Sequence, residues 1–467
     1  MTNPADLSAI ELLAAYRRGA LSPVEAIEAV LARIAAAEPA LDALYALDAT
    51  AARAAARDAA KRWREGSARG LEGVPVTIKE NIATAGVPIP LGTAARDLVP
   101  ATVDAPPAAR LREAGAVILA KTTMPDFGML SSGLSSFHRP ARNPWNTALN
   151  PGGSSAGAGA ACAAGYGPLH VGTDIGGSIR LPAAWCGVVG LKPSLGRVPI
   201  DPPFYGRVAG PMTRDVADAA LMMRELSRPD WRDSMSLPPQ DIDWMDLDRD
   251  VAGLRIGLWL DAGFGLPVDR RIRMAVEEAA RRFEAAGARI ETIDSFVTRR
   301  MLDGLDAFWR LRSHIDIAAM PAERQARVLP YIRRWAAGGA GLSGAEAYEG
   351  MQQMMAMREA AVRACQPYDA VLSPTAPCTQ FPFDAAGPTD DPARPLEHIS
   401  FTVAFNMSEQ PAISVNAGHT EAGLPIGMQI AGRRFDDLGV LRLARAWERL
   451  RPPQRPWPGP PARTGNA

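Results

Sequence analysis

Residues 131–180 are dominated by Gly, Ser, Ala and Pro and carry few charges, and this stretch constrains the fold more than any other part of the chain. It is interleaved with apolar segments, as in AGAGAACAAGYGPLHVGTDIGG (156–177). Those segments make a disordered linker the weaker interpretation. We therefore expect backbone packed closely against backbone, with Ala156–Ala164 as a helix of small residues in the centre of the protein.

The composition places the chain among globular proteins. Hydrophobic residues make up 47% of its 467 residues, which is enough for a large core, and 51 basic residues balance 51 acidic ones. A balanced charge predicts no nucleic-acid or membrane partner. The N-terminus lacks the apolar segment of a signal peptide, and no run of about 18 apolar residues suggests a membrane helix, so we expect a cytoplasmic protein. Four scattered cysteines without a CxxC pair favour neither a disulfide scaffold nor a metal site.

Alternating strand and helix patterns predict an α/β fold with a buried sheet. A β-branched run at Val74–Ile78 is followed by a helical pattern at 104–114 and an apolar run at Ala116–Ala120. Further helices are expected at 6–20, 23–37, 39–66, 213–227 (capped by Thr213), 269–286, 300–365 and 436–450, and further strands at 254–259, 288–293 and 369–373, with strand or helix pieces at 399–418 and 424–432. Composition never shifts sharply, so we expect one domain over 1–467, with N-terminal helices (1–66), a core (73–211) and a more variable part (228–396).

Three residues carry the chemistry that this sequence suggests. Lys79 closes the apolar run, and Ser154 and Ser178 each follow glycines. A serine hydroxyl is a poor nucleophile until a base removes its proton. A lysine can be that base only when uncharged, which requires burial to lower its pKa by several units. The alternative is a lysine that reaches solvent from the end of a strand.

Four motifs then occur in order: VTIKEN (76–81), GGSSAG (152–157), GTDIGGSIR (172–180) and LPAAWCGVVGLKPS (181–194). With them the chain resembles the amidase signature family, well from Gly73 to Pro211 and more loosely in the C-terminal third. The resemblance implies a single large mixed β-sheet covered by helices on both faces. It also implies amide hydrolysis without a metal or organic cofactor; esters and carbamates (urethanes) are further candidate substrates.

The same resemblance assigns roles to the three residues. Ser178 corresponds to the nucleophile that forms an acyl-enzyme, Ser154 to a relay that follows a cis peptide bond after Gly153, and Lys79 to the general base. Ser155 is expected to hydrogen-bond within the site. The family often has Asn and Glu where Thr123 and Asp126 stand here. The expected partner is a small-molecule amide, and the protein is expected to be a monomer or a homodimer.

Two glycines before Ser178 allow the backbone N–H groups of this loop to converge on one point, as a developing oxyanion requires. By resemblance, the amides of Ile175, Gly176, Gly177 and Ser178 line this oxyanion hole.

Asp174 and Arg180 flank the same loop. They are expected to pair with each other; the alternative is that Arg180 meets a substrate carboxylate, because arginine favours planar, bidentate partners.

Substrate-pocket residues are harder to assign. Phe127 and Met129 lie in MPDFGML (124–130), which resembles a segment that lines the acyl pocket in the family. Aromatic and methionine residues elsewhere suggest a hydrophobic acyl or aryl amide, although core packing explains them equally well: Phe204, Tyr205, Phe308, Trp309, Trp335 and Met354.

Two other functions remain open at this point. Residues 153–157 (GSSAG) also satisfy G-x-S-x-G, which would make Ser155 the nucleophile of an α/β-hydrolase-type esterase with one of five histidines. However, LNPGG (149–153) does not resemble the β-branched strand that this motif should follow. The second alternative is the glutaminase subunit of a tRNA amidotransferase. That subunit carries Ser-Leu-Asp-Gln before Gly-Pro, whereas this chain has FYGRVAGP (204–211).

Overall fold

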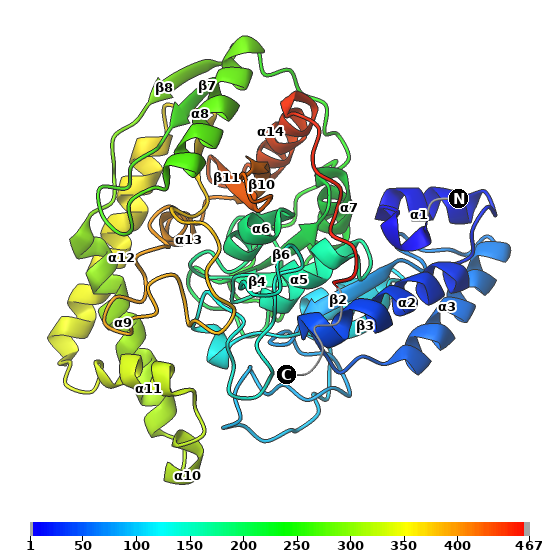
Figure 1. Cartoon of the computed structure of the whole chain (residues 1–467), viewed down its shortest axis with the longest axis horizontal. Helices are drawn as coiled ribbons and strands as arrows, with labels where there is room; N and C mark the ends of the chain where they lie inside the picture. The colour runs from blue at the N-terminus through cyan, green and yellow to red at the C-terminus, as the bar shows by residue number, and fades with distance from the viewer. Residues whose placement is uncertain (1–2, 462–467) are drawn as a thin grey trace.

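A single mixed sheet forms the centre of the computed structural model, which describes residues 3–461 (Figure 1). Its eleven strands follow the order β1-β3-β2-β4-β6-β5-β10-β11-β9-β7-β8. Strands β2, β3 and β4 are parallel at one end and β7, β8 and β9 at the other, while the pairs between them are antiparallel. The strands are β1 (Leu44–Tyr45), β2 (Pro75–Lys79), β3 (Val117–Thr122), β4 (Leu169–Asp174), β5 (Val189–Lys192), β6 (Val208–Thr213), β7 (Arg255–Leu258), β8 (Arg289–Thr292), β9 (Ala370–Pro374), β10 (Ala412–His419) and β11 (Pro425–Gly432).

Helices cover both faces of this sheet, as expected. They are α1 (Ala9–Arg17), α2 (Pro23–Leu41), α3 (Ala49–Arg64), α4 (Pro106–Glu113), α5 (Ala156–Ala164), α6 (Arg180–Cys186), α7 (Val216–Leu226), α8 (Arg270–Ala285), α9 (Arg299–Ala318), α10 (Ala322–Gln325), α11 (Pro330–Ala337), α12 (Gly344–Cys365), α13 (Val403–Met407) and α14 (Asp437–Leu450), with 3-10 helices at Pro4–Asp6 and Asp126–Gly128. Side chains alternate between the faces. In β9, Leu372 belongs to the hydrophobic cluster that includes residues of α7, α8 and α14, whereas Val371 belongs to the cluster that includes residues of α9, α12 and α13.

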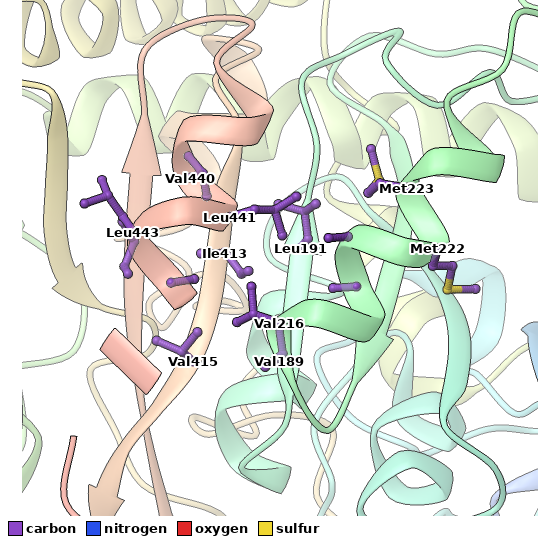
Figure 2. Packing of buried hydrophobic residues seen from close by; sticks show 14 of the residues in the cluster. Val189, Leu191, Val216, Met222, Met223, Ile413, Val415, Val440, Leu441 and Leu443 are labelled. Atoms are coloured by element: carbon purple, nitrogen blue, oxygen red, sulfur yellow. The ribbon is translucent and has the colours of Figure 1, made fainter. Parts of the chain in front are cut away.

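Figure 2 shows one of these interfaces, between strands β5 and β10 and the helices α7 and α14. Val189 and Leu191 of β5 and Ile413 of β10 point toward Val216 of α7 and Leu441 of α14. All five side chains are buried. Burial of a side chain of this size stabilises the fold by about 1.5–3 kcal/mol relative to exposure, so this layer stabilises the central strand β5 and its neighbour β10.

The Gly- and Ala-rich stretch is packed as the sequence predicts. Ala156–Ala164 is helix α5, and every residue in it is buried. A Cβ on Gly157 would clash with the carbonyl oxygen of Ala43 and would lie 2.5 Å from the amide nitrogen of Thr123. Only glycine fits where the backbones approach so closely. This contact holds the start of α5, and the serines before it, against strand β3.

Several local predictions were wrong. The pattern at 39–66 is not one helix, because α2 runs to Leu41, strand β1 follows, and α3 begins at Ala49. Thr213 does not cap the helix at 213–227; it ends β6, and the Asp215 side chain accepts from the amide of Asp218 to cap α7. Strands β4, β5 and β6 were not predicted.

The fold does not test two further predictions, the single-domain organisation and the cellular localisation. The single-domain organisation stays a prediction, and residues 1–2 and 462–467 of that domain lie outside the described part of the chain. Within residues 3–461, no helix combines the length and the apolar composition that crossing a bilayer requires. Cytoplasmic localisation stays a prediction.

Candidate active site

Lys79 ends strand β2 inside the protein and does not reach solvent, since its exposed fraction is 0%. Its Nζ lies 2.8 Å from the Oγ of Ser154, 3.0 Å from the Oγ of Ser155 and 3.4 Å from the carbonyl oxygen of Thr173. Both neighbours of β2 are parallel strands, and all five of its residues are buried. The strand therefore places the Lys79 amine in the buried interior, beside two serine hydroxyl groups.

Burial lowers the pKa of Lys79 from its usual 10.5 to about 7. The loss of hydration disfavours the ammonium form, and the positive charge of Arg207 lowers the pKa further, while Asp174 and Glu80 act in the opposite direction. Near neutral pH, a substantial fraction of the amine is therefore uncharged and able to accept a proton.

Ser154 and Ser155 stand before helix α5, and the peptide bond between Gly153 and Ser154 is cis, as expected. Ser155 occupies the N-cap position without capping the helix through its side chain. Its Oγ instead accepts from Lys79 and donates to the carbonyl oxygen of Thr173 at 3.1 Å. No histidine among residues 3–461 hydrogen-bonds to this hydroxyl, so the esterase alternative lacks its base.

Ser178 lies in the loop between β4 and α6 and lines a cavity of about 460 Å³ together with Ser154. Its carbonyl oxygen accepts from the amide of Ser155 at 3.1 Å, which ties the two serine loops together. The Ser178 hydroxyl has no hydrogen-bond partner in the described part of the chain, and it is half-buried at the cavity wall. The structure thus brings Lys79 and Ser154 into contact and places Ser178 in the same cavity, free to meet a ligand.

The amides of the glycine loop differ in what they bind. Those of Ile175, Gly176 and Ser178 donate to no protein group within residues 3–461. The amide of Gly177 instead donates to the carboxylate of Asp174 at 2.8 Å, and its role in the oxyanion hole stays a prediction. The Thr402 hydroxyl donates to the carbonyl oxygen of Gly176 at 2.6 Å, which fixes the orientation of that peptide.

Asp174 and Arg180 form a fully buried ion pair, with Nη2 of Arg180 3.0 Å from Oδ1 of Asp174 and Nε 3.0 Å from Oδ2. The remaining donors of Arg180 bind Thr402, Asn406 and Gln429. Burial alone would raise the pKa of Asp174, but the Arg180 guanidinium and the Asn406 amide hold it well below its usual range. Arg180 has no donor left for a substrate, and the pair holds the loop that presents Ser178.

The cavity contains both aromatic and charged residues. Phe127 and Met129 line it, and so does Phe204. Trp335 and Met354 do not, because they are buried in the core between α9, α11 and α12. Several further lining side chains were not singled out from the sequence; among them are Asn81, Leu91, Arg207, Arg312, Ser313 and Asp316. Arg207 could have been found within FYGRVAGP, whereas Arg312 lies on a long helix whose sequence gives no local signal.

The two departures from the family pattern serve structural contacts here. The Thr123 hydroxyl donates to the carbonyl oxygen of Asp42 or Ala43, 3.2 Å from each. The buried Asp126 carboxylate accepts from the amide and hydroxyl of Ser136, both at 2.7 Å, and from the amide of Leu329 at 3.0 Å. Asp126 therefore fastens the segment that carries Phe127 to the loop at Ser136 and to the start of α11.

Comparisons with known proteins agree with this geometry. The pattern of the Amidase family matches residues 25–441. The chain is 36% identical to a glutamyl-tRNA(Gln) amidotransferase subunit from Myxococcus xanthus, over 95% of this chain and 97% of that protein. Among solved structures, a bacterial aryl acylamidase superposes with a TM-score of 0.87 at 30% identity, covering 95% of this chain and 96% of that one.

A peptide amidase from Stenotrophomonas maltophilia is also similar, with a TM-score of 0.84 at 26% identity over 98% of this chain and 99% of that one. Family pattern, sequence and fold thus point the same way over almost the whole length. The chain belongs to the amidase signature family of amidohydrolases, enzymes that act on amide C–N bonds.

Proposed function

We propose that this protein hydrolyses a carboxylic amide through an acyl-enzyme on Ser178, with Lys79 as general base acting through Ser154. The observation that carries the proposal is the 2.8 Å contact between Nζ of the buried Lys79 and Oγ of Ser154, at the wall of the cavity that Ser178 also lines. An uncharged amine in this position can take a proton from the Ser154 hydroxyl while that oxygen takes one from Ser178.

In the proposed reaction, Oγ of Ser178 attacks the amide carbon as its proton passes to Ser154 and the Ser154 proton to Lys79. The free amides of Ile175, Gly176 and Ser178 are the candidates to bind the developing oxyanion; one such donor is worth about 2.7–4 kcal/mol of barrier. The proton returns from Lys79 along the same path to the leaving amine. Water then attacks the acyl-enzyme with the same base and releases the acid and Ser178.

Three substitutions test this assignment. Lys79→Ala and Ser178→Ala should each abolish turnover of a panel of aliphatic amides, anilides, ureas, carbamates and esters while the protein stays folded. Ser154→Ala should lower turnover less than Ser178→Ala, because the relay is lost but the nucleophile remains. Mass spectrometry of the wild-type protein quenched during turnover should find the acyl group on Ser178. Retention of most activity by Lys79→Ala would refute the mechanism.

A second candidate function has support from the relatives. Curated relatives at 33–36% identity are subunits of glutamyl-tRNA(Gln) amidotransferase, so this chain is a candidate for the same role. Under that alternative the purified chain would show little amidase activity alone and would assemble with other chains. Size-exclusion chromatography of the purified chain, together with a glutaminase assay without partners, distinguishes the two functions and also decides between a monomer and a homodimer.

A further inference from the structure

Two arginines line the cavity that holds Ser154 and Ser178, and in the described part of the chain no carboxylate lies within ion-pair distance of either. Arg207 precedes strand β6, and Arg312 lies on helix α9. Within residues 3–461 neither guanidinium forms an ion pair with a carboxylate. The fully buried Arg180 differs from both, since each of its donors is paired.

The few contacts of these arginines leave donors free. Nη2 of Arg207 donates to the carbonyl oxygen of Pro202, and Nε of Arg207 is buried without any hydrogen-bond partner. Nη2 of Arg312 has only the sulfur of Met129 at 3.6 Å. The guanidinium carbon of Arg312 lies 4.7 Å from the centre of the Phe204 ring, a cation–π contact that holds the side chain over the cavity.

Carboxylates act on both cations from beyond ion-pair distance, and one of them, Asp316, lines the same cavity. Burial lowers the pKa of Arg207, and the charge of Arg312 lowers it further, while Asp233 and Asp201 raise it. Burial also lowers the pKa of Arg312, against the effect of Asp316. Arginine keeps its proton at every accessible pH. A partly buried cation without a partner is costly, and an anion bound between the two guanidinium groups would remove that cost.

We propose that Arg207 and Arg312 bind a carboxylate of the substrate, so that the enzyme acts on amides that carry a second, acidic group. The proposal rests on the proposed function, because the reacting serine lines the same cavity. Arg312 also lines a small extension of about 40 Å³ together with Ile175 and Ser178, so a substrate anchored there reaches the nucleophile. The planar guanidinium matches a carboxylate with two parallel hydrogen bonds. Aromatic Phe127 and Phe204 then contact the apolar part of such a substrate.

Two substrate pairs test the proposal and locate the carboxylate. Glutaryl p-nitroanilide, with an acid on the acyl side, is compared with hexanoyl p-nitroanilide. N-benzoylglycine, with an acid on the amine side, is compared with N-propylbenzamide. In at least one pair the acid should have the higher kcat/KM, by about tenfold or more, since a hydrogen bond to a charged group is worth at least that factor. Equal or higher kcat/KM for the neutral member of both pairs would overturn the proposal.

Variants identify the residues responsible. Arg312→Met should reduce the acid-to-neutral ratio of kcat/KM about tenfold, and Arg207→Lys should reduce it through the loss of the planar fork. Arg300→Met is the matched control, because Arg300 lies on the same helix, is largely exposed and pairs with Glu349. The control should keep the wild-type ratio. An unchanged ratio in both Arg312→Met and Arg207→Lys would refute the assignment.

A binding measurement separates this proposal from the proposed function. Calorimetric titration of the Ser178→Ala variant with glutarate should show binding that its dimethyl ester does not, and adding Arg312→Met should weaken glutarate binding about tenfold. This result is expected even if the protein hydrolyses no amide in the panel, an outcome that would count only against the proposed function. Equal affinity for glutarate and its dimethyl ester would overturn the carboxylate site while leaving amide hydrolysis intact.

Discussion

Replacing Lys79 with methionine should abolish hydrolysis and also remove the pH dependence of stability that this position contributes. Methionine fills a similar volume but carries no charge. In the folded protein, burial holds the pKa of Lys79 at about 7, whereas in the unfolded chain it is near 10.5. Between these values the unfolded chain holds a proton that the folded chain has released. The free energy of unfolding of the wild type therefore rises with pH across this window.

The size of the effect follows from the same two values. Below pH 7 the folded protein must bury a charged amine. The difference between the two pKa values means that this lowers the free energy of unfolding by about 5 kcal/mol. The substitution also removes the hydrogen bonds to Ser154, Ser155 and the Thr173 carbonyl, worth about 1 kcal/mol each. Lys79→Met should therefore be more stable than the wild type by about 2 kcal/mol at pH 6. At pH 10, where little of the charge cost remains, it should be less stable by about 2 kcal/mol.

Urea unfolding of both proteins at a series of pH values between 6 and 10 measures this difference. In parallel, kcat/KM of the wild type should fall tenfold per pH unit below about 7, as Lys79 protonates and ceases to act as a base. A stability difference that does not change with pH, or a rate profile that falls already below pH 10, would show that the amine keeps an ordinary pKa. The assignment of Lys79 as base near neutral pH would then fail.

Further substitutions test the loop and the core. Gly177→Ala should lower kcat at least tenfold and lower the melting temperature, as steady-state kinetics and thermal unfolding would measure. The reason is that Gly177 has a φ of +128° and that a Cβ there would lie 2.7 Å from the Thr402 hydroxyl. Arg180→Met should destabilise the fold by about 3–5 kcal/mol in urea unfolding, because Asp174 is left buried without its cation. Trp335→Phe should lower stability by about 1–3 kcal/mol but leave KM unchanged, because Trp335 packs in the core away from the cavity.

Local sequence patterns predicted those parts of the site whose structure is determined by residues adjacent in the sequence. A β-branched run before Lys79 indicated a buried strand, and the structure buries that strand on both faces. Glycines around Ser154 and Ser178 indicated tight backbone geometry at the serines, which lie at one cavity. The roles assigned to these three residues still await the experiments above.

Three adjacent strands of the sheet, including β4 before the Ser178 loop, escaped prediction for a physical reason. Strands β4, β5 and β6 are buried on both faces, so their sequences lack the alternation of apolar and polar residues that marks a half-buried strand. Strand β6 also contains Pro211, opposite Val171 of β4. Proline cannot donate to a ladder and argues against a central strand. Pairing with other strands, which no local pattern reveals, makes these segments part of the sheet.

The sequence alone does not decide which arginine of this site binds a ligand and which one pairs within the protein. The sequence leaves open whether Arg180 pairs with Asp174 or binds a substrate carboxylate, and the same side chain could do either. The structure gives Arg180 a carboxylate, two side-chain amide oxygens and a backbone carbonyl, so no donor is left for a ligand. Within residues 3–461, Arg207 and Arg312 have no carboxylate or side-chain amide as hydrogen-bond partner, and both line the cavity. An arginine is free to bind a substrate only where the fold gives it no other partners. For Arg180, Asp174 is close in sequence, but Thr402, Asn406 and Gln429 come from more than 200 residues away, and the local sequence does not reveal them.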